Sequence, residues 1–194
     1  MQMNERLCRV LCAIYRGFCR VAHPVKVEGK ENLPAEGAAI LYANHQNLQD
    51  PMVLFAYLGR PLHFMAKKEL FENKVLAKVL TLIGAFPVSR GENDMTAIRT
   101  SLSVLSEGKV LGIFPEGHRY TDGEIHAAHN GVSLIALRSG AQVVPVRIQG
   151  SYRIFSKINV KVGAPVDLAD LQGRLRGENL STATERMMAA LKAL

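Results

Sequence analysis

The sequence predicts an α/β fold with a largely parallel central sheet of about seven strands flanked by helices. Short apolar runs typical of buried strands alternate with segments that have helical periodicity. Turn and cap residues delimit several of these segments, as Asp94 does before one predicted helix and Gly108 after it. The 194 residues, 48% of them hydrophobic, suit a folded domain with a sizeable core.

Residues 1–24 are expected to form an amphipathic helix ahead of an α/β domain at 25–194. Arginines interrupt its apolar stretch, which argues against both a membrane span and a signal peptide. A basic amphipathic helix suits the interface of an anionic membrane, and the alternative is a helix whose apolar side packs on the protein's own core. At about 100° per residue, one side carries Arg6, Arg9, Arg16 and Arg20, and the other carries Leu7, Val10, Leu11, Ile14, Phe18 and Val21.

The rest of the chain alternates between strand and helix patterns without a repeat or a long linker. The candidate strands are Val25–Glu28, Ala38–Ala43, Leu62–Ala66, Gly84–Val88, Val110–Phe114, Val143–Ile148 and Asn159–Val162. The candidate helices are Pro51–Leu58, Glu69–Ile83, Met95–Glu107, Gly131–Arg138 and Ser181–Ala193. Alternation of this kind is typical of a parallel sheet covered by helices.

Charge and cysteine usage narrow the possible partners. A net charge of +7 implies an anionic partner, and nucleic acid is the weaker choice because the sequence has no nucleic-acid-binding signature. Cys8, Cys12 and Cys19 are odd in number and lack the spacing of a zinc site. We therefore expect no disulfide framework, and a reducing cytoplasm as the location.

The first polar block, 44–50, directly follows the predicted strand at 38–43. His45 in this block is a candidate general base, because a neutral imidazole accepts protons near neutral pH. Asp50 could hold one ring nitrogen of that imidazole if the loop curls. The alternatives are a histidine that only bonds the backbone, and an aspartate that caps the helix beginning at Pro51.

The second polar block, 114–119, follows the strand beginning at Val110. Its proline and glycine predict a turn from which Glu116, His118 and Arg119 project. Arg90 emerges in the same way from the end of another strand, and paired arginines suit a phosphate. Lys67 and Lys68 follow a third strand and could join this anion site, or could be ordinary solvated lysines.

Four ordered blocks in this sequence resemble those of the glycerolipid acyltransferases, most closely the bacterial 1-acyl-sn-glycerol-3-phosphate acyltransferases. His45 through Asp50 resembles the family's His-x4-Asp motif, and Gly84 through Arg90 resembles its second block. The segment 114–119 resembles the third block, Phe-Pro-Glu-Gly-Thr-Arg, and 143–146 resembles the fourth. The segment 65–70 is also similar to this family, and the resemblance covers about Val25 to Pro165.

The resemblance implies an O-acyltransferase of phospholipid biosynthesis that moves an acyl group from acyl-CoA or acyl carrier protein to the sn-2 hydroxyl of lysophosphatidic acid. It implies His45 as the base, Asp50 as its orienting acid, and no metal or cofactor. Glu116 completes the catalytic set and would orient acceptor hydroxyls or arginines. The expected substrate-binding residues are Lys67, Lys68, Arg90, Gly117, His118 and Arg119. We expect a peripheral or monotopic protein at the cytoplasmic face of the cell membrane.

Two departures from the family pattern affect the acceptor. His118 replaces the usual threonine, and 128–131 replaces a Phe-Lys-x-Gly segment, so His118 or His129 could act as donors instead of the missing lysine. His126, His129 and His118 could also be read as metal ligands, although no recognisable ligand spacing accompanies them. The alternative functions are acyl transfer to glycerol-3-phosphate or another lysolipid, acyl-ester or thioester hydrolysis, and silent lipid binding.

Overall fold

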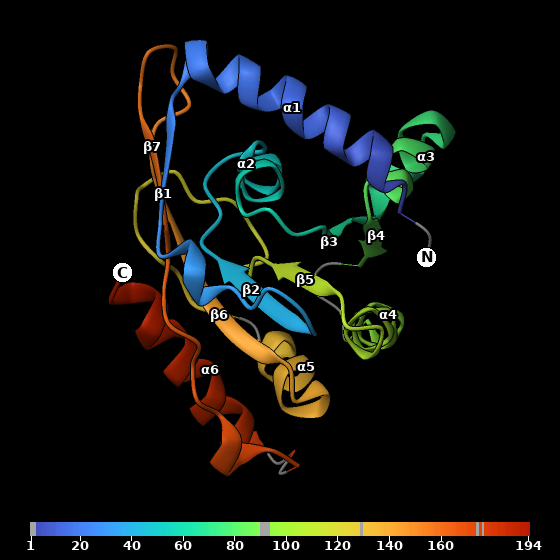
Figure 1. The fold of residues 1–194 in the computed structure, drawn as a ribbon. Coiled ribbons are helices and arrows are strands. Elements are labelled where there is room, and N and C mark those ends of the chain that lie inside the picture. The colour runs from blue at the N-terminus through green and yellow to red at the C-terminus, as the bar shows by residue number, and fades with distance from the viewer. Residues whose placement is uncertain (1–2, 90–93, 129, 174, 176) are drawn as a thin grey trace.

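The computed structural model describes residues 3–89, 94–128, 130–173, 175 and 177–194 (Figure 1). Arg90 and His129, both named in the sequence analysis, lie outside the described residues. The strands are β1 (Val25–Glu28), β2 (Ala39–Ala43), β3 (Leu62–Lys67), β4 (Ala85–Val88), β5 (Val110–Ile113), β6 (Gln142–Gly150) and β7 (Ile158–Val162). The helices are α1 (Glu5–Ala22), α2 (Asp50–Tyr57), α3 (Lys74–Leu82), α4 (Met95–Ser106), α5 (Gly131–Ser139) and α6 (Gly177–Lys192).

In the described part of the chain, the strands form one seven-stranded sheet in the order β1-β7-β6-β2-β5-β3-β4. Neighbours from β6 across to β4 pair parallel, and so do β1 and β7, whereas β6 and β7 form an antiparallel pair. The predicted, largely parallel α/β sheet is therefore confirmed. The sheet's carboxyl edge is shared by β6, β2, β5, β3 and β4, which all run in the same direction.

Both faces of the sheet are buried, as Figure 1 shows. α1 and α2 cover one face, and α4, α5 and α6 cover the other. Every residue of β2 is apolar because its side chains alternate between two cores. Leu41 packs into the core beneath α1 and α2, while Ile40 and Tyr42 pack into the core beneath α4, α5 and α6. Continuous apolar runs are the signature of strands buried on two sides, which is why the sheet could be predicted from the sequence.

Helix α1 packs on the domain through a side that the amphipathic pattern did not identify. Its cysteines Cys8, Cys12 and Cys19 are buried, and α1 lies against α2. Four residues of the side that was expected to be apolar face outward instead, with Val10 56%, Ile14 65%, Phe18 53% and Val21 72% exposed, whereas Leu7 and Leu11 of that side are partly buried. No helix in the described segments has the length and apolar character needed to span a bilayer.

The helix predicted at Glu69–Ile83 is wrong in its extent. The structure has a short 3-10 turn at Lys68–Phe71 and then the separate helix α3. Asn73 causes this break, because its side chain accepts hydrogen bonds from the N–H groups of Val75 and Leu76 and so begins a new helix.

Candidate active site

The polar blocks meet at the carboxyl edge of the sheet because the strands that precede them are neighbours. β2 lies beside β5, β5 beside β3, and β3 beside β4. The ends of these strands and the segments that follow them carry His45, Glu116, Lys67 and Ser89 in that order across the edge. Parallel strands place their carboxyl-end loops side by side, so residues far apart in sequence share one site.

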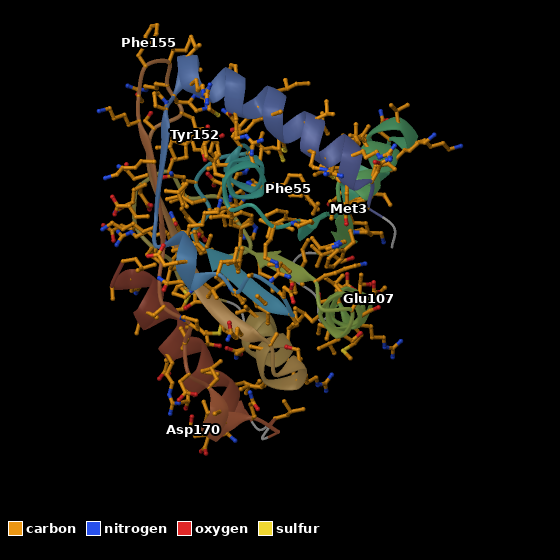
Figure 2. The ribbon with its side chains drawn as sticks, in the orientation of Figure 1. Met3, Phe55, Glu107, Tyr152, Phe155 and Asp170 are labelled. Carbon is orange, nitrogen blue, oxygen red and sulfur yellow. The ribbon has the colours of Figure 1, made fainter. Side chains whose placement is uncertain are left out.

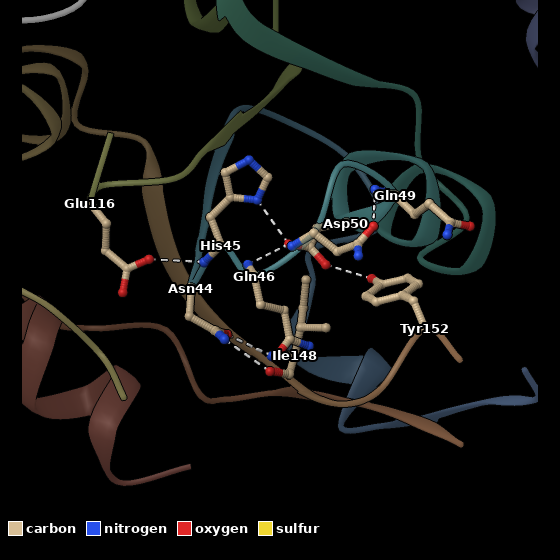
Figure 3. Close-up of polar contacts among 9 residues, drawn as sticks. Asn44, His45, Gln46, Gln49, Asp50, Glu116, Ile148 and Tyr152 are labelled. Carbon is tan, nitrogen blue, oxygen red and sulfur yellow. Dashed lines mark hydrogen bonds and ion pairs between the residues drawn. The ribbon is translucent and has the colours of Figure 1, made fainter. Parts of the chain in front are cut away.

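The imidazole of His45 contacts the carboxylate of Asp50. Their Nδ1 and Oδ2 atoms are 2.8 Å apart, the His45 residue is 8% exposed, and Asp50 is fully buried (Figure 3). The same oxygen accepts the N–H groups of Gln46 and Asn47, both at 2.7 Å, so the loop wraps around the carboxylate. A carboxylate at Nδ1 favours the tautomer with its proton there, which leaves Nε2 as the proton acceptor.

The prediction that Asp50 caps the following helix is wrong. Asp50 is the first residue of α2 and its carboxylate turns back into the loop, while Gln49 occupies the cap position without a side-chain cap bond. The loop N–H groups and the imidazole satisfy the carboxylate more completely than the helix end would. Pro51, predicted to be the first helical residue, is the second residue of α2.

Tyr152 is a site residue that sequence reasoning missed. Its phenol donates a hydrogen bond to Asp50 Oδ1 at 2.5 Å, so both carboxylate oxygens are engaged (Figure 3). Burial, followed by the nearby charge of Asp50, raises the pKa of the Tyr152 phenol, which keeps it a donor. The signal that could have found it is its position just after β6, whose carboxyl end lies at the same sheet edge as that of β2.

Asn44, the residue before His45, fastens the end of β2 to β6. Its side-chain amide donates to the carbonyl of Ile148 at 2.9 Å and accepts the Ile148 N–H at 2.7 Å (Figure 3). A side chain that mimics a strand partner in this way extends the ladder by one residue. The backbone at His45 therefore leaves the sheet in a fixed direction.

Glu116 braces the backbone of the first block. Its Oε2 accepts the His45 N–H at 2.9 Å and its Oε1 accepts the His126 N–H at 3.0 Å, and the residue is 2% exposed. The turn that carries it is closed by a Gly117 N–H bond to Phe114 O, with Gly117 at φ 69°, where glycine has no steric penalty. Both oxygens thus accept backbone N–H groups, one of them that of His45.

An aromatic stack sets the plane of the imidazole. The ring of His45 lies 4.1 Å from that of Phe114 at an interplanar angle of 22°, and Phe114 stacks in turn on Phe64. Phe64 covers Gly112 so closely that a Cβ there would lie 2.1 Å from its ring. The glycine in β5 therefore makes room for the ring that supports Phe114 and, through it, His45.

The predicted substrate-binding residues that the structure describes lie on two segments, one after β5 and one at the end of β3. His118 and Arg119 are exposed, and the next residue, Tyr120, donates its N–H to the carbonyl of His45 at 2.9 Å, so this block passes beside the backbone of His45. Lys67 is exposed and forms an ion pair with Glu69 at 3.1 Å, and Lys68 is exposed as well. His126, weighed above as a metal ligand, instead pairs with Asp122.

The sequence model of the family described as Acyltransferase matches residues 24–149, which include β1 through β5, all of β6 but its last residue, and every site residue above except Tyr152. The chain therefore belongs to the acyltransferase family and is an O-acyltransferase.

Named relatives refine this assignment. The 1-acyl-sn-glycerol-3-phosphate acyltransferase of Bacillus subtilis (strain 168) is 36% identical over 88% of this chain and 87% of its own length. The enzyme of the same name from Streptococcus pneumoniae is 28% identical over 80% of this chain and 60% of its own length. The crystal structure of the 1-acyl-sn-glycerophosphate (LPA) acyltransferase PlsC from Thermotoga maritima superposes with a TM-score of 0.77 at 26% identity, covering 98% of this chain and 79% of that one.

Proposed function

We propose that this acyltransferase moves a fatty acyl group from an acyl thioester to the sn-2 hydroxyl of 1-acyl-glycerol-3-phosphate, giving phosphatidic acid. The buried contact between His45 Nδ1 and Asp50 Oδ2 carries the proposal, because it leaves Nε2 to act on an alcohol. The names of the relatives support this acceptor.

In the proposed mechanism, His45 Nε2 removes the proton of the sn-2 hydroxyl as its oxygen attacks the thioester carbonyl. Asp50 stabilises the imidazolium that forms. The tetrahedral intermediate collapses, the C–S bond breaks, and the imidazolium returns its proton to the leaving thiolate. Positioned acid–base help of this kind contributes roughly 10²–10⁴ in rate.

Substrate charge is held, in this proposal, by the cationic segments at the sheet edge. Arg119 lies one residue from the backbone bond that joins Tyr120 to His45, so its guanidinium is the first candidate for the acceptor phosphate. Lys67, Lys68, Arg90, His118 and the Gly117 backbone complete the proposed set. The net charge of +7 would attract either acyl-CoA or acyl carrier protein as the donor.

We also propose that α1 holds the enzyme on the cytoplasmic face of the cell membrane. The support is the row of exposed apolar side chains, Val10, Ile14, Phe18 and Val21, beside exposed arginines on the same helix. An interfacial enzyme would take its lysolipid from the bilayer without exposing the acyl chain, which costs about 0.8 kcal/mol per CH₂.

The test is an acyl-transfer assay of the purified protein in detergent micelles. Lysophosphatidic acid, glycerol-3-phosphate, other lysolipids and water compete as acceptors, with acyl-CoA and acyl carrier protein as donors. We expect phosphatidic acid as the main product of the wild-type protein. The His45→Ala variant should give no phosphatidic acid, although its circular dichroism spectrum should match that of the wild type. Preference for glycerol-3-phosphate, or free fatty acid as the main product, would contradict the proposed acceptor. Normal turnover by His45→Ala would contradict the base assignment.

A further inference from the structure

The tip of the hairpin between β6 and β7 carries two large apolar side chains in solvent. Ile154 is 72% exposed and Phe155 is 82% exposed, the highest value for a large apolar residue in the described part of the chain. Figure 2 places Phe155 at the extremity of the molecule, beyond the C-terminal end of α1. Side chains this exposed gain nothing from the protein's own core.

The backbone at this tip is held in an unfavourable conformation. Phe155 has φ 67° and is the non-glycine residue with positive φ among the described residues. A bulky side chain rarely adopts this region, and such strain persists where surrounding bonds impose it, often at functional positions. Here the Phe155 N–H donates to Ala22 O at 2.6 Å and the Ser156 N–H donates to Arg153 O at 3.0 Å.

The first of these bonds joins the hairpin tip to the last residue of α1. The exposed residues Phe18 and Val21 lie near the C-terminal end of that helix, so they and the tip occupy the same end of the molecule. We define the apolar ridge as the row formed by Val10, Ile14, Phe18, Val21, Ile154 and Phe155. The two parts of the ridge come from segments more than a hundred residues apart and are fixed to each other by a backbone bond.

Exposed positive charges flank this end of the ridge. Arg153 and Lys157 lie on either side of the tip, and Arg20 lies in the last turn of α1. Protruding aromatic and aliphatic side chains with basic residues beside them match the interface of a bilayer that contains anionic lipid.

We propose that Ile154 and Phe155 form a second membrane anchor, which inserts into an anionic bilayer beside α1. The proposal rests on the membrane association proposed for α1 and extends it to a segment outside the N-terminal helix. Phe155 supplies the inserting ring, Ala22 fixes its position relative to α1, and Arg153 and Lys157 contact lipid phosphates.

The chain contains no tryptophan, so single substitutions give unambiguous fluorescent reporters. Phe155→Trp tests the tip, Ile14→Trp tests α1, and Met95→Trp is the control, because Met95 is exposed on α4 across the sheet. With phosphatidylglycerol-containing vesicles we expect blue-shifted emission and quenching by brominated lipid for Phe155→Trp and Ile14→Trp, but not for Met95→Trp. A shift for Ile14→Trp alone would overturn the second anchor and leave α1 as the membrane contact. The absence of an emission shift in both Phe155→Trp and Ile14→Trp would overturn both proposed membrane contacts. The acyl-transfer assay in micelles tests the proposed function separately.

Affinity gives a second measurement. Phe155→Asn removes the ring but suits a positive φ, so we expect thermal stability equal to or above that of the wild type. Vesicle affinity should fall about tenfold, as expected for losing a partly buried Phe side chain. Met95→Asn should bind as the wild type does. Wild-type affinity in Phe155→Asn would overturn the proposal, and equal wild-type binding to phosphatidylcholine vesicles would overturn its requirement for anionic lipid.

Discussion

The phenolic oxygen of Tyr152 is bonded to Asp50 Oδ1, while the other oxygen of the same carboxylate faces His45. The carboxylate is therefore held by a side chain from the β6–β7 connection as well as by its own loop. A buried carboxylate with this many donors is fixed in orientation, as an orienting acid for an imidazole must be.

Asp50→Asn should remove the charge that stabilises the imidazolium and place an amide N–H₂ against donors that need an acceptor. We expect kcat for acyl transfer to fall by about 10²–10⁴, with a smaller change in either KM. Steady-state kinetics in micelles measure this. A kcat within a few-fold of wild type would mean that Asp50 only shapes the loop.

Tyr152→Phe should lower kcat by about tenfold with little change in KM, because it removes one donor from Asp50 without touching the substrate. Tyr42→Phe is the matched control: it also loses a buried hydroxyl bond, to Met187 O in the opposite core, and should lower thermal stability but not kcat. Equal kcat losses in the two variants would point to general loosening of the fold.

Glu116→Gln separates positioning from substrate contact. The amide can accept only one of the two backbone N–H bonds, so we expect a lower kcat and a lower unfolding temperature together. Calorimetry and kinetics on the same preparation measure both. If Glu116 instead oriented the acceptor, its KM would rise while the unfolding temperature stayed unchanged.

Arg119→Ala should raise KM for lysophosphatidic acid by roughly tenfold or more, since charged hydrogen bonds to phosphate are strong, and raise the donor KM much less. Arg138→Ala, an exposed arginine on α5, is the control and should leave both constants unchanged. Similar rises in both KM values for Arg119→Ala would remove its role as the phosphate clamp.

His63 predicts a pH dependence of stability. It is fully buried with Nδ1 3.1 Å from Gly84 O, and burial, with a smaller effect of Lys109, lowers its pKa below the ordinary 6.5. As pH falls through 6.5, the unfolded chain protonates first, so this contribution is complete above pH 6.5 and is lost below it. Urea unfolding from pH 7.5 to 5 should show falling stability, with a flatter profile for His63→Gln. If the unfolding free energies of the wild type and His63→Gln fell in parallel with pH, His63 would be excluded as the cause of the pH dependence.

Local patterns were sufficient for the sheet but not for every helix. Each predicted strand matches an observed one to within two residues, because strands buried on two faces require short apolar runs. The capping ability of Asn73 competes with the apolar periodicity that runs through it, so one predicted helix became two elements. The last helix begins at Gly177, earlier than the predicted Ser181.

The site was predictable where the chemistry lies on one loop and not where it depends on distant segments. The spacing of His45 and Asp50 allowed a contact on one loop and the family resemblance implied it, and their 2.8 Å contact confirms that pairing. Tyr152 lies 102 residues from Asp50, and Glu116 reaches the His45 backbone across 71 residues. Such contacts depend on which strands become neighbours, which spacing along the chain does not specify.

The burial of one side of α1 determines which changes to this helix the domain would tolerate. Cys8 and Cys12 belong to the same hydrophobic core as residues of the central strands. Deletion of α1 would therefore expose part of this core and destabilise the domain. Polar substitutions at Val10 and Ile14, whose side chains are exposed, would reduce the apolar surface without disturbing the packing of the core.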